Sequence, residues 1–356
     1  MAATERIGGL QAQEPASPYI GLWSRLAGFE AAALDRAIRE RRLVKAGLFR
    51  GTLHLVSADD YVRLHPAIRV TLRGLAARDQ FRNAEVDDVD SLVDAAMAFA
   101  SEPRDNAAMH DELEALSAAE GRTSADVWWR LRREGAFLRS PSDVAWSFGR
   151  RPAYVAAGAW LGGRPFADED VSLEHLVRRY LGAFGPATVG DLRAWSHVSA
   201  ARLRPVIARL ADLIECRDDA GRTLLDLADA PRPPADTPAP PRFLPMWDGA
   251  LLGHDDRSRI LPDAFRKAVI SRNGDVLPTL LVDGLVAGLW WVEPDGARTR
   301  VAMEPFGRLS KAVRTALDDE ADRLRAFYEP IEPRVFARYR ASGARHPLPR
   351  AGESPP

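Results

Sequence analysis

The sequence predicts an α+β fold in which three tandem winged-helix units precede a C-terminal β-barrel-like domain. The first observation is a recurring order of an amphipathic helix, a short turn and an apolar stretch carrying arginine or lysine. This order occurs at 32–56, 125–140 and 200–227, and a further helical stretch precedes each copy, at 18–29, 105–119 and 188–196. Helix, helix and hairpin is the order of a winged helix. The second observation is a run of strand-like segments near the C-terminal end.

The first copy shows the periodicity of a helix followed by that of a strand. Its apolar positions Leu34, Ile38 and Leu43 suit one face of a helix, and residues 48–56 then alternate at strand spacing. In the third copy, the sequence Asp-Asp-Ala-Gly at 218–221 predicts a hairpin turn. The copies are too diverged to be a sequence repeat, so the prediction depends on their shared order.

Near the C-terminal end, the segments 276–282, 285–292 and 298–306 are separated by Asp-Gly and Pro-Asp-Gly turns. Such spacing predicts consecutive antiparallel strands. A helix over about 308–328 follows, so we expect the C-terminal unit to be a small β-barrel or a strongly curved sheet closed by that helix.

A chain of 356 residues is too long for one hydrophobic core, so we expect several domains. The boundaries that we predict are 1–100 for the first winged helix with the glutamine motif discussed below, 101–166 for the second, 167–229 for the third, 230–242 for a proline-rich linker, 243–340 for the barrel with its helix, and 341–356 for a disordered tail.

The composition is ordinary for a soluble globular protein, with 46% hydrophobic and 28% charged residues. The formal net charge of −1 gives no signal of nucleic-acid binding, so a DNA-binding function would depend on local basic faces. No run of about 18 apolar residues occurs, and residues 1–20 lack the regions of a signal peptide. We therefore expect a cytoplasmic protein that does not cross a membrane.

The sequence carries no signature of a cofactor or metal site. Nucleotide-binding glycine patterns and the GxSxG elbow are absent, and the seven histidines never pair at metal-ligand spacing. His254, Asp255 and Asp256 are adjacent, and neighbouring side chains rarely converge on one ion. The single cysteine, Cys216, excludes an internal disulfide and is expected to be a small buried hydrophobe. We expect neither a metal nor a cofactor.

The N-terminal stretch GGLQAQEPASPY holds two glutamines, Gln11 and Gln13, at positions i and i+2. They share a face if the backbone is extended, which is the conformation that Gly8-Gly9 before them and Pro15 after them favour. From the spacing alone, the simpler interpretation is two exposed polar residues in a loop.

The stretches GGLQAQEPxSPYxGLWxRLxGF and ALDRAIRERRLVKAGLFRGTLHLV resemble the winged-helix DNA glycosylases of the AlkZ and YcaQ type. YLGAFGPATVGDLRAWS, LPMWDGALLGHDDR and LLVDGLVAGLW also look like that family, so the similarity covers nearly the whole chain. In this family, three winged helices and a β-barrel surround a DNA-binding channel. Its catalytic motif is glutamine, an apolar residue, then glutamine or aspartate, which matches Gln11, Ala12 and Gln13. The family normally has a further helix before the motif, and here only residues 1–8 precede it.

The resemblance implies a monomeric, monofunctional DNA glycosylase whose partner is double-stranded DNA, so that the protein would associate with the nucleoid. The substrates implied are N7-alkylated, cationic purines, including bulky adducts or interstrand crosslinks, in DNA repair or self-resistance to genotoxins. A cationic purine is already a good leaving group, so two amides that position a water and stabilise the sugar cation could suffice.

Arg50, Thr52 and His54 are the first candidates for DNA contact. They lie at i, i+2 and i+4, so they would share one face of a strand while the opposite face points to the core. A solvated wing is the alternative.

Two further sets of basic or polar residues are candidates for DNA contact. Arg150 and Arg151 end the densest basic region of the chain. This region either contacts DNA phosphates or is a helix face exposed to solvent, and the sequence does not decide between the two. Arg272 and Asn273 lie in ISRNGDV, which carries the Asn-Gly signal of a tight hairpin. The resemblance implies that such a hairpin probes the minor groove.

Two other functions compete with the enzyme. A non-catalytic winged-helix regulator is the main alternative, although regulators usually dimerise and no coiled-coil heptads occur here. The second alternative is a structural or partner-binding scaffold in which Gln11 and Gln13 have no catalytic role.

Overall fold

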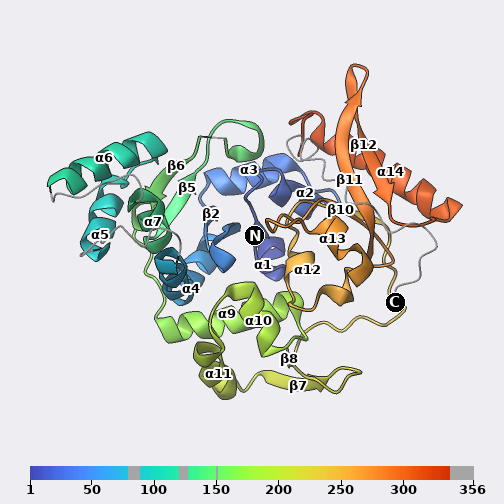
Figure 1. Ribbon diagram of the computed structural model, residues 1–356, viewed down its shortest axis with the longest axis horizontal. Coiled ribbons are helices and arrows are strands. Elements are labelled where there is room, and N and C mark those ends of the chain that lie inside the picture. The colour runs from blue at the N-terminus through green and yellow to red at the C-terminus, as the bar shows by residue number, and fades with distance from the viewer. Residues whose placement is uncertain (79–88, 120–126, 150, 337–356) are drawn as a thin grey trace. The chain divides into compact units, whose positions relative to one another are not determined.

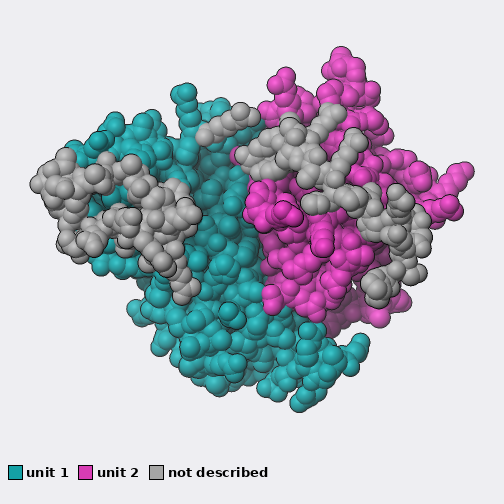
Figure 2. Space-filling view, viewed as in Figure 1, with its two compact units in different colours: residues 1–13, 31–230 teal, residues 14–30, 231–356 magenta. Residues whose placement is uncertain are grey.

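The computed structural model describes residues 1–78, 89–119, 127–149 and 151–336. The chain forms two compact units, each built from two stretches of sequence (Figure 2). Unit 1 contains Met1–Gln13 and Ala31–Ala230, and unit 2 contains Glu14–Glu30 and the chain from Pro231. Arg150 and the predicted tail at 341–356 lie outside the described residues.

Unit 1 contains most of the helices and two antiparallel sheets (Figure 1). Its helices are α1 (Ala2–Arg6), α3 (Ala31–Arg39), α4 (Ala58–Arg78), α5 (Val89–Phe99), α6 (Asn106–Ala119), α7 (Val127–Glu134), α8 (Ala157–Trp160), α9 (Glu169–Phe184), α10 (Val189–Ser196) and α11 (Ala200–Arg209), with single 3-10 turns η1 (Phe49–Gly51) and η2 (Ala145–Ser147). Its strands are β1 (Leu10–Gln11), β2 (Leu43–Gly47), β3 (Leu53–Ser57), β4 (Arg104–Asp105), β5 (Phe137–Ser140), β6 (Ala153–Ala156), β7 (Leu213–Arg217) and β8 (Thr223–Leu227).

The predicted order of helix, helix and hairpin is present, as α6, α7 and β5–β6 and again as α10, α11 and β7–β8. The first copy has the same order, but its leading helix, α2 (Ser17–Trp23), belongs to unit 2. The first two hairpins are not separate wings, because β2 pairs with β5 in a six-stranded sheet of order β1-β3-β2-β5-β6-β4. The α+β class is confirmed, and three winged-helix units remain a prediction.

The shared sheet forms because one face of both hairpins is apolar. Ala46 lies opposite Leu138, which lies opposite Val155, and all three are buried in the main core of unit 1. An isolated two-stranded hairpin is marginally stable, so joining the two hairpins buries this row and removes two exposed edges. Trp195, Tyr180 and Phe49 lie in the same core and bring α9 and α10 against it.

The third hairpin, β7–β8, forms its own two-stranded sheet with the predicted turn at 218–221. Cys216 lies on β7 and is partly exposed, so the expectation of a buried cysteine is wrong. Both neighbouring strand positions, Glu215 and Arg217, are exposed.

Unit 2 is built on an open antiparallel sheet of order β12-β11-β10-β9, and β11 and β12 form a long hairpin (Figure 1). Its elements are α2, β9 (Arg242–Leu244), α12 (Gly249–Leu252), η3 (Arg257–Arg259), η4 (Asp263–Phe265), α13 (Arg266–Val269), β10 (Thr279–Val282), β11 (Leu285–Asp295), β12 (Arg298–Pro305) and α14 (Lys311–Tyr328).

Of the predicted small β-barrel or strongly curved sheet, the barrel is not found among the described residues of unit 2. Their sheet has four strands, its edge strands β9 and β12 do not pair with each other, and so few strands cannot close a barrel. The predicted helix is present as α14, whose buried Leu317, Leu324 and Tyr328 pack toward the sheet. No helix among the described residues has the length and apolar character needed to span a membrane.

Candidate active site

The glutamine motif begins on the short edge strand β1. Gln11 lies opposite His54 of β3, and the backbone N–H of Ala12 donates to the Leu53 carbonyl at 2.7 Å. Gly9 has a φ of +85°, and a side chain there would lie 2.8 Å from a methyl group of Val56. The glycine therefore lets the chain approach β3 closely enough to add β1 to the sheet.

The two glutamine side chains meet, as the extended backbone predicts. Gln11 is buried, Gln13 is exposed, and the Gln11 Nε2 donates a hydrogen bond to the Gln13 Oε1. One amide of the pair is thus held inside unit 1 while the other is presented at its surface.

A helix does precede the motif, although the sequence offered only eight residues for it. It is α1, and its Glu5 carbonyl accepts a hydrogen bond from Arg179 of α9 at 3.1 Å. Arg179 in turn donates to the buried Asp60 Oδ1 at 2.7 Å, and His175 contacts the same oxygen at 2.7 Å. Sequence reasoning missed this anchor, because Asp60 and Arg179 are 119 residues apart.

Arg50 contacts the motif directly. It lies in η1 with a φ of 57°, and its guanidinium donates to the Gln11 Oε1 at 2.8 Å and to the Trp195 carbonyl at 2.8 Å. The predicted strand face of Arg50, Thr52 and His54 is therefore wrong, since the left-handed residue interrupts the alternation. Thr52 follows the turn, and its hydroxyl donates to the Phe49 carbonyl at 3.0 Å.

His54, which lies opposite Gln11, is buried and does not lie on a polar surface. Burial, together with the positive charge of Arg50, lowers its pKa to about 3, so the ring is neutral near pH 7. The Nδ1 lies 3.0 Å from the Thr52 carbonyl, which fixes the proton on Nδ1. Desolvation and the charges of Arg50 and Arg193 also lower the pKa of His197, which follows α10.

Acidification is expected to destabilise unit 1 through buried histidines. Folding lowers the pKa of His54 to about 3 and, through desolvation and then the charge of Arg69, that of His65 to about 4. The unfolded chain, with pKa values near 6.5, then binds more protons, so this stability is complete above pH 6.5 and is lost as the pH falls. Between pH 6.5 and 5 the loss is about 2 kcal/mol for each histidine.

Urea unfolding at pH 7 and pH 5 measures this effect. The variant His54→Asn should lose less stability between the two pH values than the wild type does. An equal loss in both proteins would show that His54 titrates normally.

The other predicted DNA contacts that lie among the described residues are exposed and belong to different units. Arg151 is exposed in unit 1, next to Arg150. Arg272 and Asn273 are exposed in unit 2, in a tight turn that Ile270 and Val276 close. The Asn-Gly hairpin signal is thus confirmed as a local structure.

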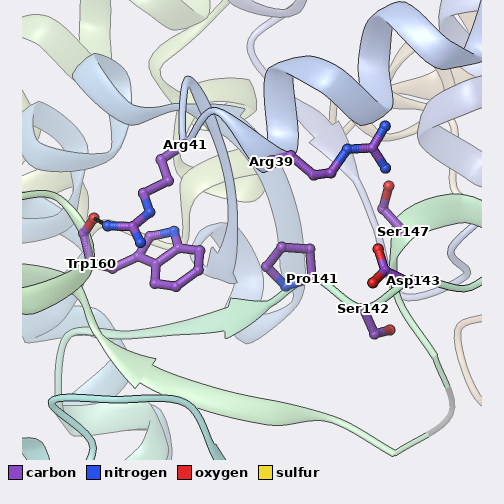
Figure 3. A pocket seen from close by; sticks show the side chains of 7 residues that line it. All are labelled: Arg39, Arg41, Pro141, Ser142, Asp143, Ser147 and Trp160. Carbon is purple, nitrogen blue, oxygen red and sulfur yellow. Dashed lines mark hydrogen bonds between the residues drawn. The ribbon is translucent and has the colours of Figure 1, made fainter.

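A separate cleft of about 340 Å³ in unit 1 contains none of the predicted site residues (Figure 3). Arg41 stacks 4.0 Å above the Trp160 ring and donates to its carbonyl at 3.0 Å. The cleft is lined by Arg39, Arg41, Pro141, Ser142, Asp143, Ser147 and Trp160. Within the described ranges, no three His, Cys, Asp or Glu side chains gather as a metal site would require.

Comparison with known proteins decides the family. The family model described as DNA glycosylase AlkZ-like matches residues 4–327. The chain belongs to the AlkZ-like DNA glycosylase family. It is 25% identical over 338 residues to an interstrand DNA cross-link repair glycosylase of Streptomyces sahachiroi, covering 89% of this chain and 87% of that protein.

The fold agrees with this membership. The solved structure of Streptomyces sahachiroi DNA glycosylase AlkZ superposes with a TM-score of 0.73 and 22% identity, covering 93% of this chain and 91% of the other. The protein is therefore a DNA glycosylase, and the resemblance seen in the sequence is confirmed. Membership of this family therefore favours the enzyme over the two alternatives, a non-catalytic regulator and a scaffold.

Proposed function

We propose that this glycosylase hydrolyses the N-glycosidic bond of N7-alkylated, cationic purines in double-stranded DNA and that Gln11 and Gln13 are its catalytic residues. The observation that carries the proposal is the hydrogen-bonded pair of amides in unit 1, the buried Gln11 on the edge strand β1 and the exposed Gln13 just after it. A pair of neutral amides can bind and orient a water but cannot act as a strong general base.

Such a site suits a substrate that needs little activation. Alkylation at N7 gives the purine a positive charge, so the base leaves readily and the sugar develops oxocarbenium character. Amide oxygens near C1′ stabilise that charge and hold the attacking water in position. We therefore expect unmodified purines, which lack this leaving-group ability, to be poor substrates.

The motif contains no lysine, so we assign the enzyme a monofunctional reaction in which water attacks and an abasic site remains. The name of the Streptomyces sahachiroi relative, an interstrand DNA cross-link repair glycosylase, supports interstrand crosslinks as substrates. Bulky adducts and a role in self-resistance are further parts of the proposal. The enzyme would act as a monomer at the nucleoid. The exposed Arg151, Arg272 and Asn273, with Arg150, are proposed contacts to DNA.

Three duplexes of one sequence test the proposal, carrying N7-methylguanine, unmodified guanine or an N7-linked interstrand crosslink. Alkaline cleavage should reveal abasic sites in the first and third duplexes and none in the second. Removal of unmodified guanine at a rate comparable to that of N7-methylguanine would contradict the proposal.

A further inference from the structure

We propose that Arg50 is a positioning residue that sets the orientation of both glutamine amides and that it does not bind DNA. The inference rests on the proposed catalytic role of Gln11 and Gln13. Both terminal nitrogens of Arg50 are used inside unit 1, one by the Gln11 Oε1 and the other by the Trp195 carbonyl, each at 2.8 Å.

The direction of the hydrogen bonds follows from the chemistry of guanidinium. A guanidinium group only donates, so the Gln11 atom that faces it is the oxygen. The Gln11 nitrogen must then point the other way, where it donates to the Gln13 Oε1. Arg50, Gln11 and Gln13 thus form a chain of hydrogen bonds that runs in one direction.

This direction decides what Gln13 presents at the surface. One lone pair of its Oε1 is occupied by Gln11, which leaves the second lone pair for a water and both N–H groups for a phosphate or sugar oxygen. The first link is charge-assisted, and neighbouring hydrogen bonds polarise one another. With the Gln11 amide reversed, its nitrogen would face Arg50 and its oxygen would face Gln13.

The surrounding fold holds Arg50 in place for this role. Its φ of 57° is in the left-handed region, and the turn is closed by the Leu48 N–H, which donates to the Thr52 carbonyl at 3.0 Å. Phe49 packs on Trp195 with ring centroids 3.8 Å apart, so the helix that supplies the carbonyl is fixed to the same turn. Lysine offers a single nitrogen and cannot reproduce the planar fork between two acceptors.

The test compares Arg50→Lys with Arg151→Gln as the matched control. Arg50→Lys should lower the single-turnover excision rate about 100-fold, as a small misplacement of catalytic groups does, with unchanged DNA affinity and salt dependence. Arg151→Gln, at a proposed DNA contact, should instead weaken binding and reduce its salt dependence. Loss of affinity with an unchanged rate in Arg50→Lys would overturn the proposal.

A second variant tests the direction of the chain. Gln11→Glu keeps an acceptor for Arg50 but has no N–H to donate to Gln13, so excision should fall although the fold is retained. Excision at the wild-type rate would show that the directed link to Gln13 is not needed.

An NMR measurement separates this proposal from the proposed function. In protein labelled with 15N-glutamine, the Gln11 side-chain amide, assigned with Gln11→Glu, should exchange slowly in the wild type and in Arg151→Gln and rapidly in Arg50→Lys. Rapid exchange in the wild type would overturn the role of Arg50, whatever the activity. Slow exchange that depends on Arg50, without excision of any lesion, would support its positioning role and contradict the proposed function.

Discussion

Replacing Gln11 and Gln13 together by alanine is expected to reduce excision of N7-methylguanine by about 10²–10⁴-fold while DNA binding remains. Removal of one preorganised hydrogen-bonding group from an active site typically costs 10²–10³-fold in rate. Because the two amides are joined by a hydrogen bond, each single substitution should be nearly as severe as the double one.

Single-turnover cleavage with enzyme in excess measures this prediction, and the affinity for intact duplex is measured separately. Glu215→Ala, which changes an exposed residue of β7, serves as the control and should excise at the wild-type rate. If the losses from the two single variants multiply in the double variant, the glutamines act independently. Excision at the wild-type rate in the double variant would show that Gln11 and Gln13 are not the catalytic residues.

Asp60→Ala is expected to destabilise the protein by about 3 kcal/mol. The carboxylate is buried and its Oδ1 lies 2.7 Å from nitrogens of both Arg179 and His175. Removing it leaves the charge of Arg179, whose side chain is only 23% exposed, without its partner.

The preceding residue provides a matched control. Asp59 forms an ion pair of 2.6 Å with Arg164, but both side chains are more than half exposed. Asp59→Ala should therefore cost less than about 1 kcal/mol. Urea unfolding of both variants at pH 7 compares the two losses in the free energy of unfolding. An equal loss would show that burial of the Asp60 ion pair adds nothing to stability.

Features set by local chemistry could be predicted from the sequence. The Gly8-Gly9 pair and the i, i+2 spacing predicted that the two amides share a face, and they form a hydrogen bond. The helix and strand periodicities predicted the order of elements, and the Asn-Gly and Asp-Asp-Ala-Gly turns lie where expected. The family resemblance gave the activity, which periodicity alone could not.

Features that depend on distant residues could not be predicted. The pairing of β2 with β5 is determined by which apolar faces meet, and Arg50 adopts a turn because Gln11 and Trp195, both far along the chain, accept its hydrogen bonds. The alternating pattern around Arg50 is equally consistent with an uninterrupted strand. Strand signals also cannot tell an open sheet from a closed barrel, since closure depends on how the edge strands pair.

The two units are interleaved along the chain, and this limits how the protein can be divided. The backbone leaves unit 1 directly after Gln13, contributes residues 14–30 to unit 2, and returns at Ala31. Within unit 2, Arg25 of that segment is bonded to the buried Asp248 at 2.6 Å. Cutting the gene at the proline-rich linker would therefore leave the C-terminal fragment without Arg25, the ion-pair partner of Asp248. Neither unit can therefore be transferred to another protein as one continuous stretch of sequence. A chimaera made with a single crossover point would exchange neither unit intact.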